Sequence, residues 1–186
     1  MSGGRLDGTR VLAIVTNYGV EQDELIVPVE RLREDGADVE IAAPTREPVR
    51  TLVGDEKPGE VVDPTETLGE VDPARYDLLL IPGGALNADH LRMNDDALEI
   101  IKDFASSGRP VAAICHAPWT LAEAGVVQGK NLTSYASLRT DLRNAGASWE
   151  DSAQVTDTNG YTLITSRTPA DLDPFVEAIE RELTPA

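Results

Sequence analysis

The chain has 186 residues, of which 41% are apolar, so its composition is that of an ordinary globular protein with one core. Its 33 acidic residues outnumber its 16 basic residues, and the formal charge of −17 disfavours nucleic-acid partners. No apolar run approaches the roughly 20 residues that a membrane span needs, no secretory signal is evident and the single cysteine forbids an internal disulfide, so we expect a cytoplasmic protein without membrane partners.

The first elements form a strand–helix–strand unit. Residues 10–16 (RVLAIVT) are a β-branched apolar run without alternation, which predicts a strand buried on both faces. Leu25, Val29 and Leu32 then recur at helical spacing, and Gly36 ends the predicted helix. Residues 38–43 predict a second strand, so the unit indicates a parallel sheet with a right-handed crossover.

Residues 44–75 are rich in proline, glycine and charge, and they predict loops with one short hairpin. The regular pattern then resumes. Residues 76–84 predict a buried strand that ends in proline and two glycines, and residues 95–108 predict an amphipathic helix. A further buried strand at 109–115 leads into a short helix at 118–125.

The last third continues the alternation. Residues 131–137 and 161–166 predict strands, and residues 137–147 and 169–183 predict helices. We therefore predict a single α/β domain over 1–186, built on a doubly wound, mostly parallel sheet. Sites in such sheets form at the carboxyl ends of the strands.

Cys115 stands where one strand passes sharply into a helix. Such a turn, a nucleophile elbow, projects its side chain out of the sheet. The following helix N-terminus would also lower the pKa of the thiol. A lone cysteine is more commonly a small buried hydrophobe, but the adjoining His116 and the strand-end position favour a nucleophile. His116 would act as its general base or acid.

The chain's only other histidine is His90. One cysteine and two histidines without CxxC or HxxxH spacing do not predict a metal site. The chain also lacks a phosphate loop and a G-x-G-x-x-G fingerprint, so we expect no cofactor.

Two further motifs lie near other strand ends. Gly83 and Gly84 leave backbone N–H groups bare, and these could form an oxyanion hole, although two glycines also suit a plain turn. Three acids, Glu21, Asp23 and Glu24, follow the first strand in YGVEQDE, where acids commonly just interact favourably with the helix dipole. A carboxyl turned toward the thiol would instead have a raised pKa and donate a hydrogen bond to the sulfur, and the residues alone leave open which acid does so.

Several segments together resemble the ThiJ/PfpI superfamily, and in particular its PfpI-like branch: AICHAPW, LLLIPGG, VEQDELIVPVERLREDGADVEIAAP, NLTSYASLRTDLRNAGASWED and LITSRTPADLDPF. The similarity runs from about residue 10 to residue 183 in the family's order. It implies a flavodoxin-like three-layer sandwich related to the class I glutamine amidotransferase fold, and a homo-oligomer, dimeric or hexameric.

The resemblance also implies roles for individual residues. The nucleophile falls on Cys115, its partner on His116, and the acid expected to hydrogen-bond the sulfur on Glu21. The oxyanion donors fall on Gly83 and Gly84, with the His116 N–H as a further candidate. An acid supplied by a neighbouring subunit corresponds to Asp89, which is shorter than the glutamate of the archaeal members.

These residues and the resemblance are compatible with three functions. The first is a cysteine-dependent enzyme of stress protection that acts on reactive carbonyls or glycated adducts, as a glyoxalase or deglycase would. The second is an intracellular peptidase that uses Cys115 and His116 with an acid from a neighbouring subunit. The third is a redox sensor or chaperone without enzymatic activity, because an exposed thiol of low pKa oxidises readily. The acidic, lysine-poor surface is typical of a protein from a high-salt habitat.

Overall fold

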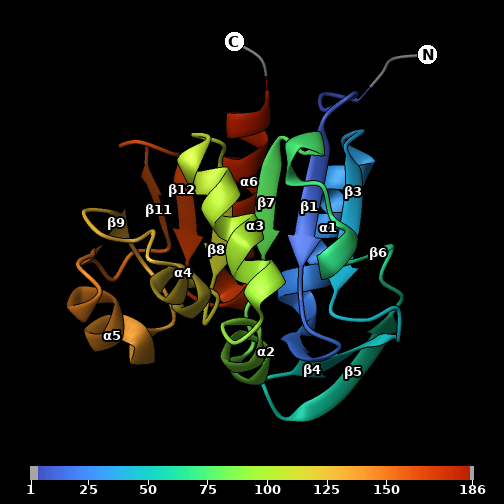
Figure 1. Ribbon diagram of the computed structural model, residues 1–186, viewed down its shortest axis with the longest axis horizontal. Coiled ribbons are helices and arrows are strands. Elements are labelled where there is room, and N and C mark those ends of the chain that lie inside the picture. The colour runs from blue at the N-terminus through green and yellow to red at the C-terminus, as the bar shows by residue number, and fades with distance from the viewer. Residues whose placement is uncertain (1–3, 185–186) are drawn as a thin grey trace.

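A computed structural model describes residues 4–184, and its centre is a seven-stranded sheet (Figure 1). The strand order is β11-β12-β8-β7-β1-β3-β6. Its strands are β1 (Arg10–Ile14), β3 (Asp38–Ala43), β6 (Glu66–Thr67), β7 (Leu78–Ile81), β8 (Val111–Ile114), β11 (Gln154–Asp157) and β12 (Leu163–Ser166). Every pairing is parallel except that between β11 and β12. The predicted doubly wound, mostly parallel sheet is therefore confirmed.

Helices cover both faces of this sheet, as Figure 1 shows. They are α1 (Gln22–Glu34), α2 (Ala85–Leu91), α3 (Asp95–Ser106), α4 (Pro118–Ala124), α5 (Arg139–Asn144) and α6 (Leu172–Leu183). Side chains alternate along the central strands: Val11 and Ala13 pack with α1 and α6, whereas Leu12 and Ile14 pack with the helices of the other face. This is a three-layer sandwich with two apolar cores.

Two small sheets accompany the main one. β2 (Tyr18–Glu21) pairs with β4 (Val49–Val53), which forms an antiparallel hairpin with β5 (Lys57–Val62). This is the hairpin predicted within residues 44–75. β9 (Asn131–Leu132) pairs with β10 (Ser148–Trp149), so the strand predicted over 131–137 is much shorter than expected. The sequence patterns did not predict β2, β6, α2, β10 or β11, all of them short.

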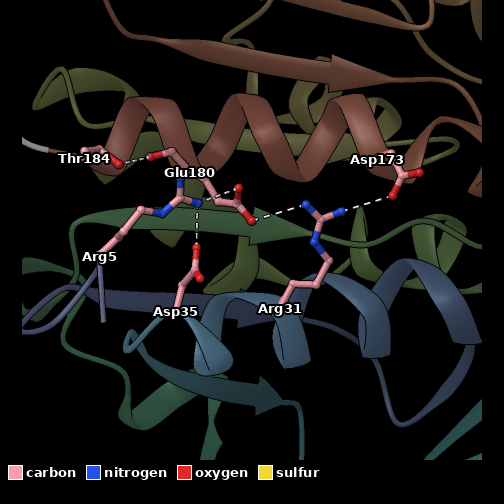
Figure 2. Close-up of polar contacts among 6 residues, drawn as sticks. All are labelled: Arg5, Arg31, Asp35, Asp173, Glu180 and Thr184. Carbon is pink, nitrogen blue, oxygen red and sulfur yellow. Dashed lines mark hydrogen bonds and ion pairs between the residues drawn. The ribbon is translucent and has the colours of Figure 1, made fainter. Parts of the chain in front are cut away.

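An ion-pair network ties the N-terminal segment to α1 and α6 (Figure 2). Glu180 on α6 accepts from Arg5 at 2.9 Å and from Arg31 on α1 at 3.3 Å. Arg5 also reaches Asp35 at 2.7 Å, and Arg31 reaches Asp173 at 3.1 Å. The network joins segments that are distant in sequence and lies between α1 and α6 (Figure 2). Within residues 4–184, no helix has the length and apolar character needed to cross a membrane.

Candidate active site

The backbone at Cys115 has the geometry of the predicted elbow. Cys115 follows β8 directly, and its φ of 64° lies in the left-handed region that residues other than glycine rarely adopt. The Cys115 N–H donates to the Ser166 carbonyl of β12 at 3.0 Å, and its carbonyl accepts from the Tyr135 N–H at 2.8 Å. These bonds on both sides hold the strained conformation, which is a common property of functional sites.

Glu24, rather than Glu21, is the acid beside the sulfur. The Glu24 side chain is fully buried and interacts with the Cys115 thiol, and its Oε2 accepts from the Gly83 N–H at 2.9 Å. The expectation for Glu21 was wrong because Glu21 ends β2 and α1 begins after it. Glu24 lies three residues further on, where the first turn of α1 points it into the site.

The carboxylate of Glu21 binds backbone N–H groups instead of the sulfur. Its two oxygens accept from the backbone N–H groups of Gly54 and Asp55, at 2.8 and 2.9 Å. Gly54 and Asp55 form the tip of the β4–β5 hairpin, and Asp55 has a φ of 57°. Glu21 therefore clamps the hairpin tip against the rest of the site.

Burial raises the pKa of Glu24 to about 8, so this carboxyl holds a proton at neutral pH. Because Oε2 accepts from Gly83, the proton belongs on Oε1, which is buried and without a hydrogen-bond partner of its own. A protonated Oε1 has an O–H that can be turned toward the neighbouring sulfur or a bound substrate. Glu24 is thus suited to donate and recover a proton.

Burial also raises the pKa of the Cys115 thiol, and the charge that Glu24 can carry raises it further, while the Gly84 N–H opposes both. The expectation that a helix N-terminus lowers this pKa was therefore wrong. The reason is structural: α4 begins three residues beyond Cys115 and has only seven residues. The thiol and the carboxyl compete for protons as a pair, so the nucleophilic form arises when the sulfur loses its proton and Glu24 keeps one.

His116 lies against the thiol. Its Nδ1 is 3.2 Å from the Cys115 Sγ, its ring stacks on Tyr135 with 4.4 Å between centroids, and Trp119 meets it edge-on. Burial lowers the pKa of His116, so its imidazole is neutral near pH 7 and can accept a proton. Trp119 packs on this ring and its Nε1–H donates to Asp141 at 2.9 Å.

Asp89 is not brought to His116 within one chain. It lies exposed on α2, and the only hydrogen bond of the His116 ring within residues 4–184 is the contact with Cys115. A role for Asp89 across a subunit contact stays a prediction.

The two glycines do not act alike. The Gly83 N–H is committed to Glu24, which contradicts its predicted role as an oxyanion donor. The Gly84 N–H points to the sulfur and is available as an oxyanion donor. The His116 N–H is available too, because it has no acceptor within residues 4–184. A Cβ at position 83 would lie 2.4 Å from Glu24 Oε2 and 2.8 Å from the Cys115 Cβ, so only glycine fits between acid and thiol.

A small pocket of about 170 Å³ opens onto the thiol. It is lined by Glu21, Glu24, Gly54, Asp55, Cys115, Tyr135, Thr168 and Pro169. Asp55 closes one side, because its Oδ1 accepts from the Ala85 N–H at the start of α2 at 2.8 Å. The residues alone left Glu24 among the possible partner acids, but the resemblance pointed to Glu21 instead. Asp55, Tyr135, Thr168 and Pro169 were not predicted as site residues at all. A hairpin was expected in residues 44–75, but nothing in its sequence indicated that its tip reaches the thiol.

Within residues 4–184, no group of three or more His, Cys, Asp and Glu side chains is arranged to hold a metal ion.

The chain matches the model of the DJ-1/PfpI family over residues 9–182. It is 40% identical over 163 residues to a Pyrococcus horikoshii protein named as a deglycase, covering 88% of this chain and 92% of that protein.

Two further comparisons agree with this match. Over 168 residues the chain is 36% identical to an Escherichia coli protein named protein/nucleic acid deglycase 2, covering 90% of this chain and 94% of that protein. Among solved structures, Drosophila melanogaster DJ-1beta superposes with a TM-score of 0.84 and 32% identity, covering 95% of this chain and 90% of the other.

Proposed function

Because the chain belongs to the DJ-1/PfpI family, we propose that it is a cysteine-dependent enzyme that converts reactive dicarbonyls, free or as glycated adducts, into hydroxy acids. One observation carries the proposal: Cys115 opens into a small pocket beside a buried carboxyl that holds a proton at neutral pH. Relatives named as deglycases support it.

The first step is addition to an aldehyde. The sulfur of Cys115 gives its proton to the neutral His116 imidazole, 3.2 Å away, and attacks the aldehyde carbon of methylglyoxal. A C–S bond forms while the carbonyl π bond breaks, and the new alkoxide accepts hydrogen bonds from the Gly84 N–H and the His116 N–H. Glu24 gives its proton to this oxygen, which yields a hemithioacetal and leaves Glu24 as a carboxylate.

The second step moves a proton within the bound substrate. Glu24 as carboxylate takes the proton from the former aldehyde carbon, and the resulting enediol recovers a proton at the adjacent carbon. The product is a thioester of lactate, which water hydrolyses to lactate and the free thiol. Methylglyoxal plus water gives lactate, so no external oxidant or reductant is needed. An adduct on an amine passes through the same steps after the amine leaves as the free base.

The pocket favours this reaction over proteolysis. A volume of about 170 Å³ suits a molecule of a few heavy atoms rather than an extended peptide. Peptidase activity is the second candidate because the His116–Cys115 contact is that of a nucleophile and base. It would also need a carboxylate to orient His116, which a neighbouring subunit would have to supply.

Lactate formation from methylglyoxal tests the proposal, with the wild type compared with Cys115→Ser. We expect the wild type to form lactate and the variant to lose at least 100-fold in kcat/KM. The same assay on methylglyoxal-treated N-acetyllysine amide, which carries an amine and no carboxylate and is freed of unbound methylglyoxal, separates deglycase from glyoxalase activity. Equal lactate formation by both proteins would overturn the proposal, and turnover of a fluorogenic peptide lost in Cys115→Ser would support the peptidase instead.

A further inference from the structure

The pocket beside Cys115 contains acidic side chains and no Lys or Arg to balance them. Three of its eight lining residues are Glu21, Glu24 and Asp55. Glu24 is neutral at pH 7, and two backbone N–H groups compensate Glu21. Asp55 is different, because only its Oδ1 has a donor, the Ala85 N–H, and no Lys or Arg within residues 4–184 pairs with it. Asp55 therefore contributes an uncompensated negative charge.

Asp55 is also held in place. Its own N–H donates to Glu21 at 2.9 Å, its Oδ1 accepts from α2 at 2.8 Å, and its left-handed backbone fixes the direction of the side chain. Its charge acts on the groups at the centre of the site, since it opposes ionisation of both the Cys115 thiol and the Glu24 carboxyl. An anionic substrate group that reached this pocket would meet the same repulsion.

Resting on the proposed function, we infer that the pocket selects neutral carbonyl compounds and amine-bearing adducts over carbonyl compounds that carry a carboxylate, and that Asp55 enforces this selection. Such a carboxylate would lie near an uncompensated charge and would find no cation among the lining side chains. The discrimination is a difference between two substrates and does not require that Asp55 take part in the chemistry. Because Asp55 is exposed at the rim, added salt weakens the effect.

Asn is the matched replacement at this position. Its amide oxygen can still accept from the Ala85 N–H, and Asn tolerates a positive φ better than most residues. Asp55→Asn thus removes the charge with little change in shape. Glu99→Gln is the control for net charge, because Glu99 lies on α3 and lines a different pocket.

The first experiment compares 4,5-dioxopentanoate, an anionic 2-oxoaldehyde, with its neutral methyl ester, both assayed as formation of the 2-hydroxy acid. At low salt we expect the wild type to prefer the ester by about tenfold in kcat/KM, equivalent to about 1.4 kcal/mol. Asp55→Asn should lose most of this preference and Glu99→Gln should retain it. An unchanged preference in Asp55→Asn would overturn the inference.

The second experiment does not depend on turnover. Iodoacetamide and iodoacetate alkylate a thiolate by the same displacement, in which a C–S bond forms, the C–I bond breaks and iodide leaves. Mass spectrometry follows alkylation of Cys115, and 2-mercaptoethanol gives the intrinsic ratio of the two reagents. We expect iodoacetate to be about tenfold slower on the wild type than this ratio predicts, and Asp55→Asn to restore the ratio.

The two experiments separate the inference from the proposed function. If iodoacetate is disfavoured at Cys115 but no hydroxy acid forms, the proposed carbonyl chemistry is contradicted and the inference that Asp55 selects against anions is supported. Alkylation at the intrinsic ratio in the wild type, or no alkylation of Cys115 by either reagent, would overturn the charge selection whatever the enzyme turns over.

Discussion

Two regions that bury ionisable groups, Cys115–Glu24 and Lys130–Asp157, surround these groups in opposite ways. Lys130 is 4% exposed, and its Nζ donates to Asp157 at 3.2 Å and to the carbonyls of Asn159 and Tyr161. Asp157 also accepts from the N–H groups of Asn131 and Asn159, both at 2.8 Å. We call this Lys130–Asp157 cluster the brace, and both of its charges have partners.

The pKa values follow from that difference. Burial alone would raise the pKa of Asp157, but the two backbone N–H groups and Lys130 together lower it below its ordinary value. Glu24 is buried with one backbone N–H and no cation, and its pKa rises to about 8. Burial with complete partners yields a structural brace, whereas burial with incomplete partners yields a group able to exchange a proton near neutral pH.

The largest effect is expected from breaking the brace. Lys130→Met removes the cation and leaves Asp157 buried without it, which should lower the free energy of unfolding by about 3–5 kcal/mol. Denaturant unfolding measures the loss. Lys102→Met is the control, because Lys102 forms an exposed pair with Glu99 and its loss should cost less than about 1 kcal/mol. Equal effects of the two substitutions would contradict the contrast between brace and surface pair.

The next effect concerns activity. Glu24→Gln keeps an oxygen for the Gly83 N–H but removes the exchangeable proton, so hydroxy-acid formation should fall by about 100-fold or more. Glu21→Gln changes the neighbouring acid, which clamps the hairpin and lies off the proton path, so it should cost less than about tenfold. A pH–rate profile separates a chemical role from a structural one: its alkaline limb near pH 8 should disappear in Glu24→Gln. Retention of that limb would reject Glu24 as the proton donor.

The pH dependence of stability distinguishes the two regions by sign. Glu24 has a pKa raised from 4.5 to about 8, so between these values the folded state binds more protons than the unfolded state and stability falls as pH rises. The slope should approach about 1.4 kcal/mol per pH unit and should be absent in Glu24→Gln. Asp157, with a lowered pKa, contributes stability above pH 3.8 that is lost on acidification. Unfolding of wild type and Glu24→Gln from pH 5 to pH 8 measures the difference, and parallel curves would contradict it.

The sequence predicted the main sheet and the elbow because both depend on local patterns. Apolar runs fix the central strands, and the change from strand to helix around Cys115 fixes the turn. The acid beside the sulfur could not be chosen in this way. Whether Glu21 or Glu24 faces inward depends on where α1 begins, and the short strand β2 moves that start to Gln22. Element boundaries are what sequence patterns define least well.

The far wall of the pocket depends on contacts that no local pattern contains. Asp55 reaches the site only because Glu21 holds the hairpin tip and α2 receives its carboxylate. Both contacts join segments about 30 residues apart or more, between elements whose spatial order the sequence does not state. The Lys130–Asp157 brace could not be predicted for the same reason, because Lys130 directly precedes β9 and Asp157 ends β11, and the two meet only in the folded protein.

The smallest expected effect measures the strain at the elbow. At a φ of 64°, glycine is relaxed and alanine is not, so Cys115→Gly should be more stable than Cys115→Ala by about 1 kcal/mol, after the extra chain entropy of glycine is subtracted from the gain. Ala112→Gly, in the regular part of β8, is the control and should lose about 0.5–1 kcal/mol. Chemical denaturation of the three variants measures both differences. If glycine destabilised position 115 as it does position 112, the elbow would hold no strain, and the nucleophile would owe its position to packing alone.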